Sequence, residues 1–187
     1  MILGITGTNG AGKGTAVEYL VNEKGFTHYS VRVFLIEEIQ KRGMAVDRSS
    51  MRTVANDLRT THEPSYIIGL LYQRAVDAGL KNAVIESVRN SGEAEFLQSH
   101  GALLWAIDAD RDIRYERIQK RASETDRITF DEFVVQEERE WHGAEGKADM
   151  DILTVMSMAD HTFYSNLGKN ELYLEVEEAL QEVESKQ

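Results

Sequence analysis

Residues 4–15 read GITGTNGAGKGT, and this glycine-rich segment directly follows the apolar run that opens the chain. Residues 1–6 predict a short buried strand, and apolar residues at three- and four-residue spacing from Lys13 to about Lys24 predict a helix. A strand, a glycine-rich turn with a lysine, and a helix N-terminus together can hold a polyphosphate, because backbone N–H groups converge on its anionic oxygens. The segment therefore predicts a phosphate-binding loop.

The general pattern of such loops is a glycine, any four residues, and then Gly-Lys-Ser/Thr. Gly7, Gly12 and Lys13 fit this pattern, but Gly14 follows the lysine and Thr15 comes one place later. The Gly-Lys-Gly-Thr ending resembles the loop of adenylate kinase and other nucleoside monophosphate kinases. This resemblance implies that the loop binds ATP and that Lys13 is a catalytic residue at the outer phosphates. The expected nucleotide-binding loop residues are Gly7, Asn9, Gly10, Ala11, Gly12, Lys13, Gly14 and Thr15.

Short apolar runs alternate with helical patterns along the rest of the chain. The expected further strands are 26–30, 82–88, 101–110 and 159–166, and the expected helices include 31–43, 48–60, 64–79 and 91–99. We expect Asp47 to open the helix at 48–60, and Pro64 to occupy the first turn of the next helix. This alternation predicts a parallel sheet with helices on both faces.

We therefore predict one α/β domain over residues 1–187, with the P-loop NTPase fold and a five-stranded parallel sheet. Acceptor-binding helices are expected over about 31–79. The stretch 123–149 is highly polar and has little strand character, so it is the expected small inserted lid.

The composition narrows the functional classes. The chain has no cysteine, which excludes disulfides and thiolate zinc sites. Its net charge of −11 argues against a general nucleic-acid binder, which needs a basic face. The sequence shows no leader pattern and no apolar stretch of the roughly 18–20 residues that span a bilayer. We expect a cytoplasmic monomer or homodimer that takes small-molecule nucleotides and binds neither nucleic acid nor membrane.

An acidic and a basic residue stand at the end of the expected strand 82–88. Glu86 closes its apolar run, and Arg89 follows three residues later. Because ligands bind at the carboxyl ends of parallel strands, Glu86 is expected to face the loop and hold Mg²⁺ through water, with Thr15 as a second metal-site residue. The segment resembles the Asp-Gly-Phe-Pro-Arg stretch of adenylate kinases. It resembles more closely the Asp-Gly-Ile-Arg stretch of archaeal proteins related to dephospho-CoA kinase and adenylate kinase.

Residues 111–127 carry a cluster of basic side chains, and three- and four-residue spacings place several of them on one helix face. The Arg117/Arg121 pair is similar to the pair that flanks the lid in adenylate kinases. That similarity implies that Arg117 lies by the donor adenine and that Arg121 is a catalytic cation at the transferring phosphate. Arg127 is expected to add a further catalytic cation from the lid. The alternative is a solvated helix whose arginines pair with neighbouring acids. The segment 159–180 resembles the closing strand and helix of dephospho-CoA kinases, which implies that Asn166 and Gly168 lie beside the donor base.

The expected acceptor pocket departs from these families. In the archaeal relatives the segment after the second strand reads Met-Gly-Asp-x-x-Arg-Glu-Glu, whereas here Val33 and Ile36 stand where the acid and the arginine would lie. Other arginines are available to replace that cation, and the expected acceptor-binding residues are Arg32, Arg59 and Arg89, with Arg52 as a further candidate. The acids at 108–110 are interpreted as incidental, and the five histidines as surface or strand-end residues. The alternative for His28 and His62 is a place in the lining of the acceptor cleft.

The second strand carries no carboxylate that could take a proton from an acceptor hydroxyl. A phosphate acceptor needs no such base, because its oxygen is already anionic and the transfer depends on positioning and charge. We therefore expect an ATP- and Mg²⁺-dependent phosphotransferase whose acceptor is a (deoxy)nucleoside monophosphate. The alternatives are a dephospho-CoA kinase-like enzyme and a nucleotide-binding regulatory protein without an acceptor.

Overall fold

A computed structural model describes residues 1–121, 128–141 and 150–186. Its strands form one sheet in the order β2-β3-β1-β4-β5, and every neighbouring pair is parallel. The strands are β1 (Ile2–Gly7), β2 (Thr27–Ser30), β3 (Ala83–Glu86), β4 (Leu103–Asp108) and β5 (His161–Tyr164). The glycine-rich segment therefore leaves the central strand of the sheet.

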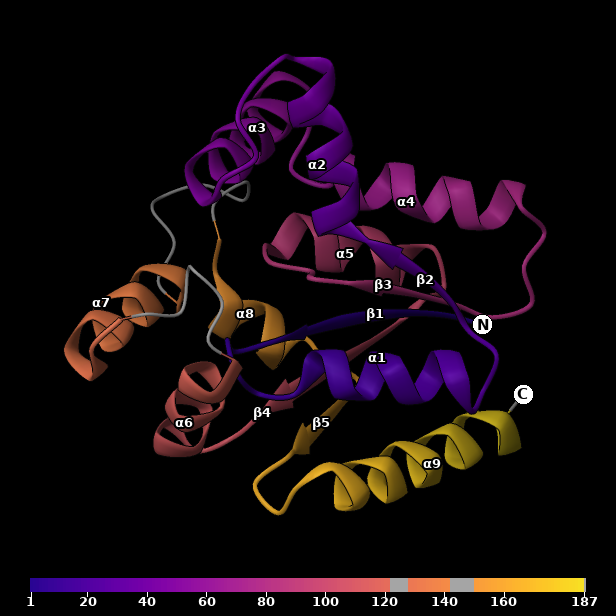
Figure 1. Ribbon diagram of the computed structural model, residues 1–187. Helices are drawn as coiled ribbons and strands as arrows, with labels where there is room; N and C mark the ends of the chain where they lie inside the picture. Colours follow the sequence, from indigo (N-terminus) through magenta and orange to yellow (C-terminus); the bar gives the residue numbers. More distant parts are fainter. Residues whose placement is uncertain (122–127, 142–149, 187) are drawn as a thin grey trace.

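Helices cover both faces of this sheet (Figure 1). They are α1 (Lys13–Asn22), α2 (Val31–Lys41), α3 (Arg48–Thr61), α4 (Tyr66–Asp77), α5 (Ser91–Ser99), α6 (Arg111–Arg121), α7 (Phe130–Trp141), α8 (Ile152–Ser157) and α9 (Lys169–Ser185). The predicted fold, a five-stranded parallel sheet with helices on both faces, is confirmed.

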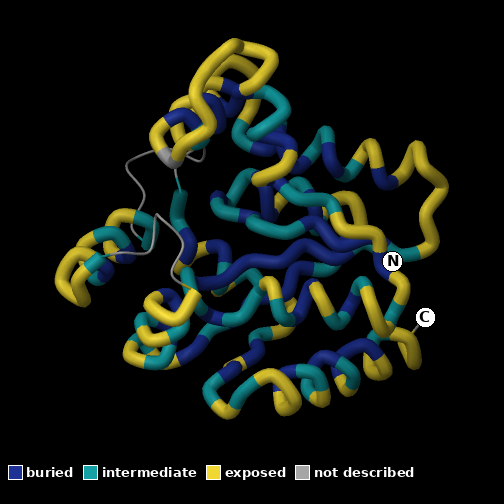
Figure 2. The backbone as a smooth tube through the Cα atoms, viewed as in Figure 1, coloured by how far each residue is buried: buried dark blue, intermediate teal, exposed yellow. Residues whose placement is uncertain are grey.

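Two separate hydrophobic cores hold the layers together. On one face, Leu3 and Ile5 of β1 pack with Leu20 of α1 and Val176 of α9. On the other face, Ile85 of β3 packs with residues of α2, α3, α4 and α5. The central strand is buried along its length (Figure 2), which explains why its sequence is a continuous apolar run rather than an alternating one.

Local chemistry sets most of the element boundaries. Asp47 caps α3 as expected, because its side chain accepts a hydrogen bond of 2.8 Å from the backbone N–H of Ser50. Gly25 and Gly43 follow α1 and α2 with φ of 69° and 67°, a left-handed conformation that suits glycine. The expectation for Pro64 was wrong: α4 begins at Tyr66, and Pro64 lies in the turn before it.

The polar stretch 123–149 contains a helix that the sequence did not predict. Phe133 of α7 is 2% exposed, and its ring lies 5.6 Å from that of Tyr115 on α6. Segments 122–127 and 142–149, on either side of α7, lie outside the described residues. Figure 1 shows α3, α6 and α7 gathered around the carboxyl ends of the strands. In the part of the chain that the structure describes, no helix has the length and apolar character needed to cross a membrane.

Candidate active site

The glycine-rich loop is shaped by contacts that leave no room for side chains. A Cβ at Gly7 would lie 1.9 Å from the carbonyl oxygen of Ile107, and one at Gly10 would lie 2.6 Å from that of Arg114. Both glycines also have positive φ, 131° and 82°. The loop can therefore press against β4 and α6 only because these positions are glycine. Gly14 differs, because a Cβ there would meet nothing within 4 Å.

Lys13 folds back over the loop that carries it. Its Nζ atom donates to the carbonyl oxygens of Gly7 at 2.8 Å and Thr8 at 2.7 Å. Burial lowers the pKa of the Lys13 ammonium to about 7, and the nearby charge of Arg89 lowers it further, against the opposing effect of Glu140 and Glu86. A bound anion at the loop would reverse this shift by supplying the missing negative charge.

Side chains from β4 and from the turn after β5 fasten the loop. The hydroxyl of Thr8 donates to the carboxylate of Asp108 at 2.5 Å. Ser165 donates from its hydroxyl to the carbonyl oxygen of Ala11 and accepts a hydrogen bond of 2.8 Å from Arg117. Interpreting Asp108 as incidental was therefore wrong, since it holds the loop. The sequence feature that could have indicated this role is the position of Asp108 at the end of an apolar run, which it shares with Glu86.

A cavity of about 1400 Å³ opens at the carboxyl ends of the strands, beside the loop. Its charged lining consists of nine cationic side chains and four carboxylates, although the protein as a whole carries a net charge of −11. The cations are Lys13, Arg32, Arg52, Arg59, Arg89, Arg117, Arg121, Arg139 and Lys169, and the carboxylates are Glu18, Asp47, Glu86 and Glu140. This concentration of positive charge indicates an anionic ligand.

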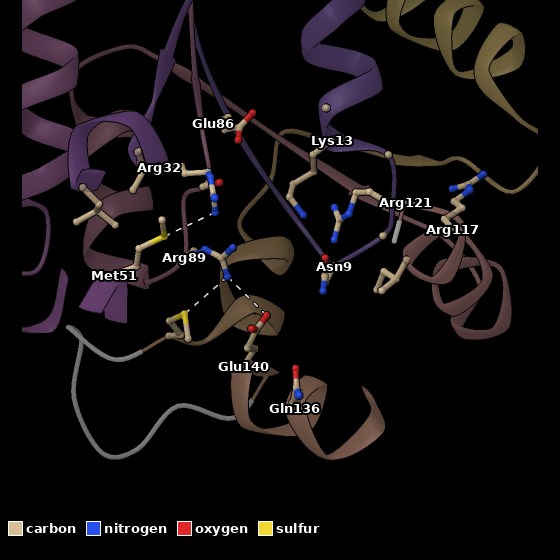
Figure 3. A pocket seen from close by; sticks show the side chains of 18 of the residues that line it. Asn9, Lys13, Arg32, Met51, Glu86, Arg89, Arg117, Arg121, Gln136 and Glu140 are labelled. Carbon is tan, nitrogen blue, oxygen red and sulfur yellow. Dashed lines mark hydrogen bonds and ion pairs between the residues drawn. The ribbon is translucent and has the colours of Figure 1, made fainter. Parts of the chain in front are cut away.

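Four of these cations point toward one region of the cavity from four different elements (Figure 3). They are Lys13 from the loop, Arg32 from α2, Arg89 from the segment after β3, and Arg121 from α6. Arg32 touches the sulfur of Met51 at 3.6 Å, and Arg89 pairs with Glu140 of α7 at 3.5 Å. Cations that converge in this way can neutralise the charge of a phosphoryl group.

Glu86 faces the same region and is paired with a histidine. Its Oε2 atom lies 3.2 Å from Nε2 of His28 on β2. The hydrogen bond from His28 lowers the pKa of the Glu86 carboxyl against the opposing effect of burial, and the charges of His28, Lys13 and Arg89 lower it further. Glu86 is therefore held ionised, as a residue near a metal ion must be. The pairing of His28 was missed, because the sequence does not show that β2 and β3 are neighbours.

Arg59 is the most buried of the cavity-lining arginines, with 3% of its side chain exposed. Its Nε and Nη2 atoms both donate to one oxygen of Glu93, at 3.0 and 2.7 Å. The other oxygen of Glu93 accepts a 2.7 Å hydrogen bond from the backbone N–H of Arg89. Glu93 thus joins α3 to the segment that carries Arg89, and it offsets the charge of Arg59.

The AAA domain family matches residues 3–142, which is most of the chain. The chain belongs to the AAA domain family. The chain is similar to the UPF0200 protein of Pyrococcus horikoshii, with 26% identity over 98% of the chain and 97% of the relative. The UPF0200 protein of Methanocaldococcus jannaschii is 25% identical over 98% of the chain and 90% of the relative.

Solved kinase structures share the fold of this AAA domain. Shikimate kinase from Bacteroides thetaiotaomicron superposes with a TM-score of 0.58 at 13% identity, over 97% of this chain and 98% of that one. A gluconokinase from Sinorhizobium meliloti gives 0.56 at 11% identity, over 97% and 91%. The fold is therefore that of the P-loop kinases.

Most of the sequence-predicted site residues of the AAA domain line the one cavity. Those that do are Asn9, Gly10, Gly12, Lys13, Gly14, Thr15, Arg32, Arg59, Glu86, Arg89, Arg117, Arg121 and Gly168. Gly7 and Ala11 instead form the body of the loop, where Ala11 is fully buried. Asn166 accepts a hydrogen bond of 2.8 Å from the backbone N–H of Asp110, so it joins two loops. Arg127 lies outside the described residues.

Several residues of the site were not foreseen. Val33 is 55% exposed, and neither it nor Ile36 lines the cavity, whereas Val31, Arg32 and Leu35 of the same helix do. α7 adds Gln136, Arg139 and Glu140. Across residues 1–121, 128–141 and 150–186, no three or more His, Asp or Glu side chains gather to hold a metal ion by themselves.

Proposed function

We propose that this protein is an ATP- and Mg²⁺-dependent phosphotransferase that moves the γ-phosphoryl group to a small phosphorylated acceptor, a (deoxy)nucleoside monophosphate. The single observation that carries the proposal is the convergence of Lys13, Arg32, Arg89 and Arg121 on one region of the cavity (Figure 3). These cations come from the nucleotide loop and from the opposite wall, so they bracket a group that passes between two ligands.

The size of the cavity supports two ligands rather than one. A pocket for one small molecule typically measures about 300–1,000 Å³, and this cavity measures about 1400 Å³. One end is lined by the loop, Arg117, Gly168 and Lys169, which is the donor side in this proposal. The other end is lined by α2 and α3, with Arg32, Met51 and Arg52, and it would take the acceptor.

The carboxylates of the cavity support an anionic acceptor. Glu18 pairs with Lys169, Asp47 caps α3, Glu86 pairs with His28 and Glu140 pairs with Arg89. Each is engaged, and the lowered pKa of Glu86 makes it a weak base. Transfer to a hydroxyl acceptor is helped by a base, whereas an acceptor phosphate needs only cations and alignment.

In this proposal the loop N–H groups and Lys13 hold the donor phosphates, and Arg89 holds the acceptor phosphate in line with the γ-phosphorus. An acceptor oxygen then forms a bond to that phosphorus while the bond to the β–γ bridging oxygen breaks, and ADP leaves. Arg121 offsets the charge that develops on the transferring group. Bound Mg²⁺ neutralises charge on the outer phosphates of ATP. Glu86 and Thr15, which both line the cavity, are the residues that would hold it through water.

We also propose that residues 123–149 act as the lid of this single domain, with Arg127 as a further cation. The described part of that stretch, α7, supports this role, because it brings Arg139 and Glu140 to the cavity and docks on α6 through ion pairs from Glu137 to Arg111 and Arg114. A bisubstrate analogue should slow proteolysis within residues 123–149. Equal cleavage with and without the analogue would contradict the lid.

An acceptor panel with ATP and Mg²⁺, measured as ADP formation, tests the proposed function. Nucleoside and deoxynucleoside monophosphates should give acceptor-dependent ADP, and Lys13→Met should lower its rate by about two to three orders of magnitude. Turnover with dephospho-CoA as the sole active acceptor would instead identify the dephospho-CoA kinase-like alternative. ATP binding without any acceptor-dependent ADP would favour the regulatory alternative.

A further inference from the structure

The residue after Glu86 has an unusual backbone. Ser87 has φ of 74°, and among the described residues it is the only one other than glycine with a positive φ. A side chain in this left-handed region is disfavoured by contact between Cβ and the neighbouring carbonyl. Glycine would avoid that cost, so this backbone would suit a glycine better than the serine that occupies it.

Hydrogen bonds on both sides prevent this backbone from relaxing. The carbonyl oxygen of Ile5 on β1 accepts from the backbone N–H of Ser87 at 2.9 Å and from that of Val88 at 3.1 Å. The carbonyl of Val88 in turn accepts 2.8 Å from the hydroxyl of Thr6. The turn after β3 is thus fastened to the strand that leads into the phosphate loop, and the conformation of Ser87 is imposed by that junction.

The same junction brings the turn that carries Ser87 to the cavity that Lys13 also lines. Ser87 is bonded to Ile5, which lies two residues before Gly7, and Lys13 donates to the carbonyls of Gly7 and Thr8. Ser87 lines the cavity, as do Glu86 before it and Arg89 after it. Within the described parts of the chain, no protein group forms a hydrogen bond with the Ser87 hydroxyl.

We propose that Ser87 is a further phosphate-binding residue, whose hydroxyl donates a hydrogen bond to the γ-phosphoryl group of a nucleoside triphosphate held on the loop. The inference rests on the nucleotide-binding part of the proposed function and is independent of the acceptor. A role for the hydroxyl would explain why Ser87 carries a side chain at a positive φ, where glycine is the favoured residue. Lys13, Ser87 and Arg89 all line the cavity in which the outermost phosphate of a nucleotide held on the loop would lie.

Two variants separate the hydroxyl from the backbone. Ser87→Ala removes the hydroxyl and keeps a Cβ at positive φ, whereas Ser87→Gly removes the hydroxyl and also relieves the backbone. Calorimetric titrations with the β,γ-imido analogue of ATP and with ADP, each with Mg²⁺, measure both affinities without any acceptor. We expect both variants to bind the triphosphate analogue about tenfold more weakly, since hydrogen bonds to charged groups have about this strength. ADP affinity should change less than about twofold. Ser87→Gly should also raise the midpoint of thermal unfolding by roughly 2–4 °C, and Ser87→Ala should not.

Three results would overturn the proposal. The first is an unchanged ratio of triphosphate to diphosphate affinity in both variants. The second is a lower ratio in Ser87→Ala alone, because the effect would then come from the backbone rather than the hydroxyl. The third is a wild-type protein that binds neither nucleotide. If the acceptor panel fails but the two variants behave as expected, the phosphotransferase proposal is wrong and the role of Ser87 stands.

Discussion

Arg89 and Glu140 form an ion pair across the cavity, with Nη1 of the arginine 3.5 Å from Oε2 of the glutamate. Arg89 follows β3, and Glu140 belongs to α7, so the pair joins the sheet to the helix inside the expected lid. In the proposed reaction an acceptor phosphate takes the place of the Glu140 carboxylate on Arg89. Binding of the acceptor would therefore break a contact between α7 and the sheet.

Arg89→Ala should raise the KM for the acceptor by roughly tenfold to over a hundredfold, since a charge-assisted pair with phosphate contributes about 1.5–3 kcal/mol. ATP binding should change little. Steady-state kinetics with each substrate varied in turn measure the two effects. Arg42→Ala is the matched control, because Arg42 pairs with Asp57 on the surface and does not line the cavity. A loss of ATP affinity in Arg89→Ala would assign this arginine to the donor instead.

ATP binding should take up a proton from solution at pH 8. The pKa of Lys13 is about 7 in the free protein, so the side chain is mostly neutral at that pH, and the phosphates favour its charged form. Affinity should therefore fall as the pH rises above 7. Calorimetry in two buffers of different ionisation enthalpy measures the uptake, and Lys13→Met should abolish it. Equal uptake in wild type and Lys13→Met would contradict the assignment.

Lys13→Met should lower turnover by about two to three orders of magnitude without lowering the thermal stability. The folded-state pKa of Lys13, about 7, lies below its ordinary value of 10.5, so the unfolded chain binds the extra proton between these values. Stability from this group accordingly increases as the pH rises from 7 toward 10.5. Thermal unfolding at pH 7 should show Lys13→Met at or above the wild-type midpoint. A clearly lower midpoint would mean that the lost turnover reflects misfolding.

Gly14→Ser should fold normally and lower the Mg²⁺ concentration needed for half-maximal activity. It restores a hydroxyl where the general loop pattern has one, and a Cβ there meets nothing within 4 Å. Gly10→Ser is the contrasting variant, because its Cβ would lie 2.6 Å from the Arg114 carbonyl at φ of 82°. Thermal unfolding and Mg²⁺ titrations compare the two. Strong destabilisation by Gly14→Ser would contradict the open geometry.

Glu86→Gln should raise the Mg²⁺ requirement more than the ATP requirement. The change removes the negative charge that the hydrogen bond from His28 now stabilises, while the side chain keeps its size. Activity measured over a grid of Mg²⁺ and ATP concentrations separates the two requirements. An unchanged Mg²⁺ titration would remove Glu86 from the metal site.

The sequence was informative where chemistry is local. The loop from Gly7 to Thr15 was recognisable because the spacing of its glycines and lysine along the chain defines it. Short apolar runs indicated the position of each strand. The contacts of Asp108 and His28 were not foreseen, because they depend on β4 lying beside β1 and on β2 lying beside β3. Strand order is a property of the folded sheet, and no short segment encodes it.

Two features of the site were not foreseen, for different physical reasons. Val33 and Ile36 stand at the positions of the family's acid and arginine, whereas helix α2 presents Val31, Arg32 and Leu35 to the cavity. In the polar stretch, α7 buries only a narrow strip that includes Phe133 and Glu137. Glu137 can be buried because Arg111 and Arg114 neutralise its charge. A helix whose buried face includes a carboxylate does not show the apolar periodicity by which helices are predicted from sequence.

Because of the buried Arg59–Glu93 pair, the C-terminal turn of α3 should tolerate substitution much less well than its N-terminal half. Removing either partner would leave a buried charge unpaired, which typically costs about 3–5 kcal/mol, so the C-terminal turn of α3 is fixed. Met51 and Arg52, about two turns earlier, face the cavity with no such anchor. Substitutions at Met51 and Arg52 should therefore be able to change the acceptor preference in a directed-evolution experiment without unfolding the protein.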